Sequence, residues 1–495
     1  MKITVIGGGT AGVMAATYFK SYWGDLAQIT MVYDHKRPGI GVGESLTPIF
    51  DNYLKTVGVS TVELIKNCNA TIKLGLKFTN WTHEGSEGFH GFPNNRLIEQ
   101  LDPTLLHYDS ILASELISNE FDNGYFYSNF YQKNNRLPDA DNLSYRHALH
   151  VDANLLGRYI ENKFKDKICI IDGIVENVIV ENNNIKTIKL ENGEELTADL
   201  FIDASGLERV LIKNLNPQWI DMSDMLPTDR TIPNPLFRDF DVLPVCTTAE
   251  ATKNGWILDV PLSNRHGTGY VYSSKFMSDD DAKKDFNQWL LKKYNVELAS
   301  DRVIKFSSGF YNEQWIGNCV AIGLASGFIE PLEATNIHHT FSQIDSIVRL
   351  YDGKVLELTR STYNQRLKDI YNDGFEYIRF FYHTKRKDSE FWRYMDEHTP
   401  SKIKEIEEVM SHSFLTNEFF QFKYNMFDAA DFNCIGLAHG FYKNNLVIEK
   451  FLKSKYLYDY SKQTLDIIKL IGKEYTQSSI DHKEWIDSIL GGETR

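Results

Sequence analysis

The sequence predicts a mixed α/β (α+β) protein, with a Rossmann-type dinucleotide-binding domain, a β-rich middle segment and a helical C-terminal region. Three observations support this prediction: a glycine-rich turn between a strand and a helix near the N-terminus, a meander of short strands over residues 174–206, and helical patterns such as TLDIIKLIGKEY at 464–475. The chain has 495 residues, about three times the length of a typical single domain, so we expect one large composite domain or two to three smaller ones.

The glycine-rich turn lies in KITVIGGGTAG, where a β-branched strand over residues 2–6 runs into the pattern G-x-G-x-x-G and a helix follows. In this pattern the first glycine permits the tight turn, the second lets the backbone approach a pyrophosphate, and the third lets the helix pack on the strand. A second strand ends at Asp34, where an acid would bind a ribose hydroxyl. The predicted cofactor contacts here are Gly7, Gly9, Thr10, Ala11, Gly12 and Asp34.

The meander IVENVIVENNNIKTIKLENGEELTADLFIDASG has polar NNN and ENGE turns and ends in a buried strand that leads to Asp203. This order is typical of FAD-binding domains of the hydroxylase type, although any sheet with polar turns would give a similar pattern. A further glycine-rich turn, GIGVGESLTPIF at 39–50, places Glu44 beside a helix start.

Composition excludes several classes of protein. Lys and Arg number 53 against 67 Asp and Glu, a net charge of −14, and the charges are scattered, whereas nucleic-acid binding requires clustered positive charge. The first residues already form a strand and no apolar run reaches the ~18 residues of a membrane span, so we expect no signal peptide, no membrane segment and a cytoplasmic location. The cysteines are far apart and lack a Cys-x-x-Cys pair, which predicts reduced core thiols and no metal site: Cys68, Cys169, Cys246, Cys319 and Cys434.

Several separated segments together resemble the flavin-dependent halogenases of the tryptophan-halogenase family. They are VIGGGTAG, GVGESLTP, CNATIKLGLKFTNW, GFHGF, HVDANLLGRYI, ADLFIDASG, NRHGTGYVYSSKF, GNCVAIGLASGFIEPLEAT and DSEFWR. The resemblance implies FAD as cofactor, supplied in reduced form by a separate flavin reductase, with O2 and a halide as co-substrates. It implies that hypohalous acid forms and halogenates an electron-rich aromatic molecule of the indole or phenol kind. It also implies a homodimer or a higher homo-oligomer.

The resemblance also assigns residues. It implies Lys73 and Glu333 as catalytic residues, and it implies further FAD contacts at Gly43, Glu44, Asp203 and Gly323. The implied halide site is Thr335 and Asn336, and the implied substrate contacts are His90, Phe92, Trp256 and Phe427. Two alternatives stay open, a flavin-dependent monooxygenase that hydroxylates an aromatic and a catalytically inactive FAD-binding protein, and neither requires Lys73 together with Glu333.

Some positions depart from the family pattern. The W-x-W-x-I-P motif reads WILDVP at 256–261, Ala334 replaces Ser after the glutamate, and Asn336 replaces Gly. The aromatic segment near the C-terminus is replaced by FKYNMFDAADFNC at 422–434. These departures weigh against tryptophan as the substrate, and they predict a halide site that accepts bromide or iodide as well as, or better than, chloride.

Local patterns give the ordinary interpretation of the same residues. In NATIKLGLKFTN, apolar and polar residues alternate as in one strand, which would make Lys73 and Lys77 solvated lysines. Only Lys73 acquires a catalytic role from the resemblance. After Glu333, the spacing of Ile337, Phe341, Ile344 and Val348 predicts an amphipathic helix, with Thr335 and Asn336 as caps. Without the resemblance, Glu333 would be an acid at a helix start and His90 a packed loop residue.

The predicted domain organisation is a discontinuous FAD-binding domain over residues 1–110, 145–215 and 300–350. A β-rich substrate segment fills 216–300, and a mainly helical substrate-binding region fills 351–495.

Overall fold

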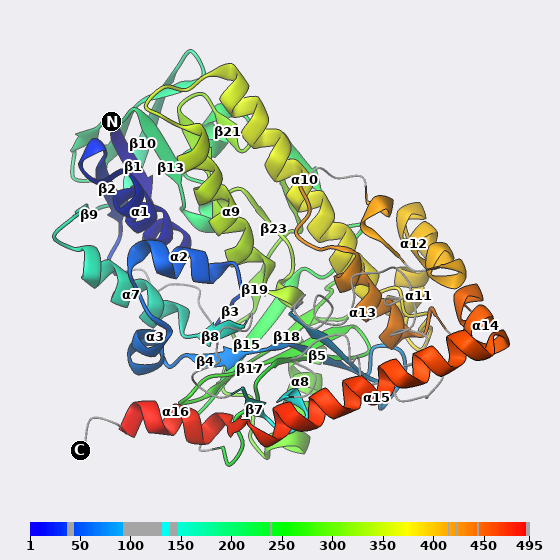
Figure 1. Ribbon diagram of the computed structural model, residues 1–495. Coiled ribbons are helices and arrows are strands. Elements are labelled where there is room, and N and C mark those ends of the chain that lie inside the picture. Colours follow the sequence, from blue (N-terminus) through cyan, green and yellow to red (C-terminus); the bar gives the residue numbers. More distant parts are fainter. Residues whose placement is uncertain are drawn as a thin grey trace. The chain divides into compact units, whose positions relative to one another are not determined.

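The computed structural model describes residues 1–36, 44–92, 131–138, 147–237, 240–413, 415–420, 424–442 and 445–491. The chain divides into two compact units (Figure 1). The first unit contains residues 1–70, 150–227 and 305–374, and the second contains 71–149, 228–304 and 375–495. The boundary at residue 374 falls inside one helix, α10 (Glu357–Phe381).

The first unit is built on a six-stranded sheet. Its order is β21 (Trp315–Ile316), β22 (Cys319–Ala321), β13 (Leu200–Asp203), β1 (Lys2–Ile6), β2 (Gln28–Tyr33) and β9 (Cys169–Asp172). All neighbours are parallel except β21 and β22. The central strands are almost wholly buried, as expected for a parallel sheet covered on both faces. The Rossmann-type prediction is therefore confirmed.

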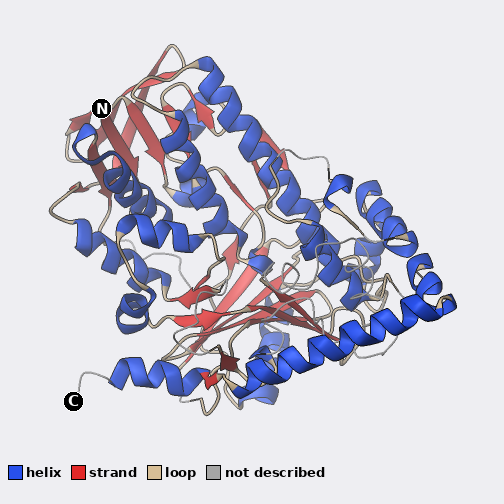
Figure 2. Cartoon of the chain, in the orientation of Figure 1, coloured by secondary structure: helices blue, strands red, loops and turns tan. Residues whose placement is uncertain are grey.

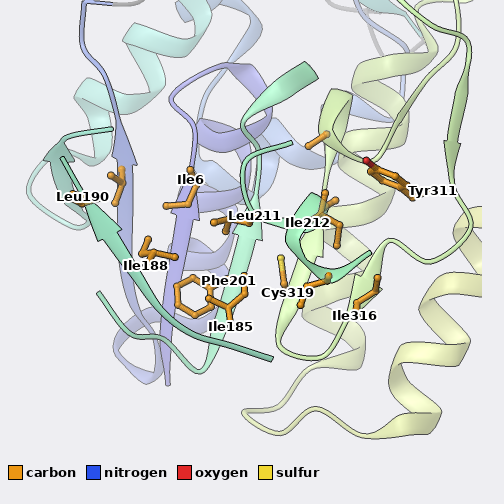
Figure 3. Close-up of a cluster of buried hydrophobic side chains, with 14 residues drawn as sticks. Ile6, Ile185, Ile188, Leu190, Phe201, Leu211, Ile212, Tyr311, Ile316 and Cys319 are labelled. Atoms are coloured by element: carbon orange, nitrogen blue, oxygen red, sulfur yellow. The ribbon is translucent and has the colours of Figure 1, made fainter. Parts of the chain in front are cut away.

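The predicted meander is also present, as β10 (Val175–Glu181), β11 (Asn184–Leu190) and β12 (Glu195–Leu196). Figure 3 shows Ile185, Ile188 and Leu190 of β11 packed against side chains of the sheet, among them Ile6, Phe201 and Cys319. Helix α1 (Thr10–Trp23) packs against α7 (Ala153–Phe164), α2 (Phe50–Val57) and α9 (Thr335–Leu350) in the same unit. The stripe predicted for α9 is buried.

The second unit contains a sheet in which β15 (Arg230–Leu236), β18 (His266–Tyr272), β17 (Gly255–Pro261), β16 (Thr247–Ala251), β5 (Gly75–Thr79) and β6 (Glu87–Gly91) follow one another. One face carries Ile257 and Tyr270, which pack on α8 (Asp279–Tyr294). Cross-strand pairing places Trp256, Phe78 and His90 on the opposite face. That face packs on the end of α10 and on α13 (Ala429–His439), through contacts of Phe78 and His90.

Helices dominate the C-terminal part of the second unit (Figure 2). They are α11 (Glu390–Glu397), α12 (Ser401–His412), α13, α14 (Leu446–Lys453), α15 (Lys455–Gln477) and α16 (His482–Gly491). A short strand before α16, β24 (Ile480–Asp481), pairs with β7 (Arg136–Leu137). Among the described residues, the structure has no helix that is both long and apolar enough to cross a membrane.

Three boundaries differ from the predicted ones. Residues 71–92 belong to the second unit, because β5 pairs with β16. Residues 216–227 belong to the first unit, because β14 (Trp219–Asp221) pairs with β20 (Gly309–Tyr311). Residues 351–374 also belong to the first unit, where Tyr371 stacks on Phe310 with the ring centroids 4.8 Å apart. One cysteine differs from the prediction, since Cys169 is exposed and the other four are buried.

Candidate active site

The turn between β1 and α1 has the geometry that a dinucleotide requires. A Cβ on Gly12 would lie 1.9 Å from the carbonyl oxygen of Gly7, so helix and turn meet at a distance only glycine permits. Gly7 itself has φ +120, and a Cβ there would lie 2.3 Å from the oxygen of Ala204. At Gly9, by contrast, no described atom lies within 4 Å of the Cβ position. The backbone at Gly9 therefore faces open space at the first turn of α1, where the helix dipole favours a phosphate.

Two acids lie at the carboxyl ends of β2 and β13, the two strands that flank β1. Asp34, directly after β2, accepts a hydrogen bond from the backbone N–H of Lys36 at 2.9 Å. Asp203 ends β13, is fully buried, and accepts from the N–H groups of Ser205, Leu211 and Ile212. Both of its oxygens are engaged in this way. Asp203 therefore holds the loop after β13 in place. The motif alone did not reveal this structural role.

Gly323 approaches the same turn from another strand end. It begins the short 3-10 helix η5 (Gly323–Ala325), and a Cβ there would lie 2.9 Å from Cβ of Ala11. Its N–H donates to Oε1 of Gln343 at 2.8 Å, and Nε2 of Gln343 donates to Oγ of Ser326 at 2.6 Å. The structure therefore brings together Gly323, Ala11 and the glycine turn. Glu44 lies in β3 (Glu44–Ser45), which pairs with β8 (Ala148–Val151), and Gly43 lies outside the described residues.

Glu333 lies at the end of the 3-10 helix η6 (Pro331–Glu333), directly before α9, and is 4% exposed. The next residue, Ala334, has a left-handed backbone with φ +58, a conformation that L-residues other than Asn and Asp seldom adopt. Strained backbone of this kind is concentrated at functional turns. It directs the chain from η6 into α9 within one residue.

The residues predicted as a halide site form the first turn of α9. The cap of this helix is Ala334, which has no polar side-chain atom, so the prediction that Thr335 and Asn336 act as caps is wrong. Asn336 instead donates from Nδ2 to the carbonyl of Ile329 at 3.2 Å, which ties the helix start to the segment before η6. Thr335 is fully buried, and its hydroxyl has no hydrogen-bond partner among the described residues. A buried hydroxyl beside uncapped N–H groups can donate to a small anion.

Lys73 ends β4 (Thr71–Lys73) in the second unit and is 1% exposed. Its ammonium lies 5.2 Å from the ring centroid of Phe92, a cation–π distance. Removal of an ammonium group from water costs free energy, so a buried lysine is unusual in a strand that serves only the fold. The single strand predicted over this segment is interrupted at Leu74, and β4 and β5 are separate.

Lys77, two residues into β5, has a different environment. Its Nζ is 2.9 Å from Oε1 of Glu87, and one third of its side chain is exposed. The prediction that Lys77 is an ordinary surface lysine is confirmed. The break at Leu74 is the physical reason that two lysines of the same polar face have such different exposure.

His90, on β6, is 4% exposed and connects two helices. Its Nε2 is 3.0 Å from Oδ1 of Asp431 on α13, and its Nδ1 is 3.1 Å from the hydroxyl of Tyr377 on α10. The ring of Tyr377 stacks on Phe427 with the centroids 3.8 Å apart and 17° between the planes. Of the predicted substrate residues, the structure therefore links His90 to Phe427 through Tyr377. Trp256, on β17, is fully buried on the same sheet face as His90.

Tyr377 and Asp431 were missed by the sequence analysis. Asp431 is the fourth residue of a capping box that begins at Asp428, a D-x-x-D pattern visible in the sequence. Tyr377 lies in the last two turns of α10, and no local signal distinguishes it from other helical tyrosines. Both are found only once β6, α10 and α13 are packed together.

Comparison with known proteins gives a consistent result. The family model described as tryptophan halogenase matches residues 2–447. Tryptophan 7-halogenase RebH of Lentzea aerocolonigenes is 31% identical over 418 residues, which is 79% of this chain and 78% of that protein. The 7-chloro-L-tryptophan 6-halogenase KtzR of Kutzneria sp. (strain 744) is 28% identical over 438 residues, with 79% of this chain and 81% of that protein covered.

Solved structures agree. A tryptophan C-6 flavin-dependent halogenase (chlorinase) from taromycin biosynthesis superimposes with a TM-score of 0.87 at 25% identity, and 99% of each chain is covered. A flavin-dependent halogenase from Xanthomonas campestris has the same fold, with a TM-score of 0.88 at 24% identity over 99% of this chain and 98% of that one. With the family model spanning most of its length, this chain belongs to the tryptophan halogenase family of flavin-dependent halogenases.

Proposed function

We propose that this protein halogenates an electron-rich aromatic molecule of the indole or phenol class, with Lys73 and Glu333 as its catalytic residues. Family membership supports the reaction type, and one observation carries the assignment of residues: the ammonium of Lys73 is 1% exposed and held against the Phe92 ring. A hydroxylase has no use for a buried lysine of this kind.

The glycine turn would hold the cofactor, since Gly9 faces space for a pyrophosphate and Gly7 and Gly12 close the turn around it. Reduced FAD, supplied by a separate flavin reductase, provides with O2 the oxidising equivalent that converts halide to hypohalous acid. The residues of the first unit contribute binding, orientation and exclusion of water around that chemistry.

Thr335 and Asn336 would hold the halide. The Thr335 hydroxyl and the N–H groups of the first turn of α9 offer hydrogen bonds and a positive dipole end, which suit a chloride, bromide or iodide ion. Departure from the family pattern at Ala334 removes a hydroxyl from this turn, which favours the larger and softer halides.

Lys73 would hold the electrophilic halogen in one of two ways. Its ammonium would donate a hydrogen bond to hypohalous acid, or its amine would take the halogen from the acid, with cleavage of the oxygen–halogen bond and release of water, to give a haloamine. An ammonium is a compact donor on a long side chain, which suits it to hold a small electrophile in place. Glu333 would polarise the halogenating species and accept the proton that leaves the aromatic ring. His90, Phe92, Trp256 and Phe427 would contact the substrate.

The test is mass spectrometry on a panel of free indoles, phenols and other small aromatics. Each compound is incubated with the protein, FAD, a flavin reductase, NADH, O2 and one halide at a time. Lys73→Ala should abolish the halide-dependent product, whereas Lys77→Ala, in the neighbouring strand and ion-paired to Glu87, should retain it.

Each outcome has a distinct meaning. A halogen mass increment that disappears with Lys73→Ala and persists with Lys77→Ala supports the proposal. Insertion of oxygen without dependence on halide would identify an aromatic monooxygenase instead. Bound FAD with neither product across the panel, and no hypohalous acid trapped by an added dione, would indicate a catalytically inactive flavin-binding protein.

A further inference from the structure

The strand that carries Lys73 is attached to the C-terminal helix α16 by a histidine. The backbone N–H of Ile72 donates to Nε2 of His482 at 3.1 Å, across 410 residues of sequence. Both residues are fully buried. Figure 1 shows α16 beside β7 and β4 in the second unit. The residue next to the proposed catalytic lysine is thus bonded to a helix that begins 35 residues beyond the family-model match.

The imidazole of His482 occupies a break in a parallel ladder. Leu76 pairs with Thr247 in the parallel β5–β16 ladder, and two residues earlier the N–H of Leu74 donates to the carbonyl of Val245 at 2.7 Å. Two residues earlier again, the same register would bring the N–H of Ile72 opposite the carbonyl of Leu243, in the segment that leads to β16. The N–H of Ile72 and the carbonyl of Leu243 do not pair directly. The imidazole of His482 bridges them, since its Nε2 accepts from Ile72 and its Nδ1 lies 3.1 Å from the oxygen of Leu243.

This arrangement fixes the tautomer of the ring. A backbone N–H can only donate and a backbone carbonyl can only accept, so Nε2 must be unprotonated and Nδ1 must carry the proton. Burial lowers the pKa of His482 to about 4, against smaller opposing contributions from the carbonyls of Leu243 and Pro244 and the charge of Asp481. The neutral ring is therefore the form present at neutral pH.

The helix that supplies His482 is itself anchored in the second unit. The N–H of His482 donates to the carbonyl of Asn135 at 3.0 Å, β24 pairs with β7, and Trp485 and Ile486 are buried. One residue before Ile72, the hydroxyl of Thr71 donates to the carbonyl of Pro261 at 2.6 Å. Residues 71, 72 and 74 are therefore each bonded to a different segment, which leaves Lys73 in the middle of a fixed stretch of backbone.

We infer that His482 is a positioning residue for Lys73: it bridges the opened ladder between Ile72 and Leu243 and holds the lysine-bearing strand in place from the C-terminal helix. This inference rests on the role proposed for Lys73. The alternative is that His482 contributes only to general stability, as any buried residue of α16 would.

The test uses the full chain and three variants. His482→Ala removes the bridge, and His482→Gln keeps one donor and one acceptor with a spacing similar to that of the ring nitrogens. Ile486→Ala is the matched control, since it creates a cavity one turn along the same helix and leaves both ring nitrogens of His482 in place. Denaturant unfolding then identifies conditions in which the His482→Ala and Ile486→Ala proteins remain folded and have lost comparable stability.

The main measurement is the rate at which Lys73 is modified by formaldehyde and a borohydride reductant, followed by mass spectrometry of its peptide. Loss of a buried hydrogen bond should raise local opening of β4, and thus modification of Lys73, roughly tenfold in His482→Ala. His482→Gln should restore most of the protection. Lys77 reports on the same region and should be modified at an unchanged rate in all proteins.

The second measurement is the amount of halogenated aromatic formed per hypohalous acid, with an added dione that traps the acid. His482→Ala should lower this ratio and leave the rate of flavin oxidation unchanged, whereas Ile486→Ala should change neither. Equal modification of Lys73 in His482→Ala and Ile486→Ala would overturn the inference. If the wild-type protein forms no halogenated product but Lys73 modification responds as expected, the proposed function fails and the positioning role stands.

Discussion

His90 and Asp431 are separated by 341 residues in the chain, and their side chains lie 3.0 Å apart in the interior of the second unit. The second oxygen of Asp431 accepts from the N–H of Asp428 at 2.7 Å, so this carboxylate caps α13 and holds His90 at once. A carboxylate can only accept, which places the proton of His90 on Nε2 and lets Nδ1 accept from Tyr377. The contact thereby sets which ring nitrogen of His90 is basic.

Asp431→Asn should reverse that tautomer. If the amide oxygen keeps the bond from Asp428, the amide NH2 faces His90 and Nε2 must become an acceptor. We expect the rate of product formation to fall roughly 10- to 100-fold, because a hydrogen bond to a charged group is lost. The pH–rate profile and kcat/KM measure the effect. Asp428→Asn, which preserves a good cap at a residue that makes no hydrogen bond to His90 among the described residues, is the control, and equal losses in both variants would refute this role.

Gly9 and Gly12 should respond in opposite ways to the same added methyl group. Gly12→Ala places Cβ 1.9 Å from the Gly7 oxygen and should destabilise the fold by about 1–3 kcal/mol. In Gly9→Ala the added Cβ lies near no atom of the described residues, and the φ of −74 at this position is one that any residue adopts. The free energy of unfolding should therefore hardly change. FAD affinity, measured by quenching of flavin fluorescence, should nevertheless fall, because the methyl group enters the space assigned to the pyrophosphate. Unchanged affinity in a folded Gly9→Ala protein would contradict that assignment.

Asp259 makes the protein sensitive to acid. Burial by itself would raise its pKa, but the hydrogen bond from His266 at 2.8 Å and the charges of His266 and Lys293 lower the pKa to about 2. Because the folded pKa lies below the ordinary value near 3.8, the contribution is present above pH 4 and is lost as pH falls toward 2. We expect about 1 kcal/mol of the free energy of unfolding to be lost through this group between pH 5 and pH 3.

Urea unfolding across that range checks the prediction about Asp259. Asp259→Asn should be less stable at pH 7, and its stability should fall less steeply between pH 5 and pH 3. A pH dependence identical to that of the wild-type protein would exclude Asp259 as a source of the acid sensitivity.

Ala334→Ser should change halide preference. The variant restores the hydroxyl typical of the family at the turn between Glu333 and Thr335, and a small hydroxyl donor favours the smaller, more strongly hydrated anion. In competition assays with equal concentrations of chloride, bromide and iodide, the wild-type protein should form brominated or iodinated product in preference to chlorinated product. Ala334→Ser should increase the chlorinated share, and a clear chloride preference in the wild-type protein would contradict the prediction.

The sequence by itself determined the parts of this protein that depend on local chemistry. Gly7 and Gly12 could be assigned because a turn without side chains is required at each position, whatever the rest of the chain does. The strand meander and the buried stripe of α9 followed from periodicities of two and 3.6 residues, which are properties of neighbouring residues. The resemblance to the halogenases rested on such short segments, and the family match confirmed it.

Only the tertiary structure decided the environments of the candidate catalytic groups. The alternation around Lys73 and Lys77 is the same for both, yet one is buried against Phe92 and the other ion-paired to Glu87, because the strand leaves the sheet at Leu74. The partners of His90 and of Ile72 come from helices more than 280 residues away. Such contacts depend on how sheets and helices pack together, which no short stretch of sequence encodes.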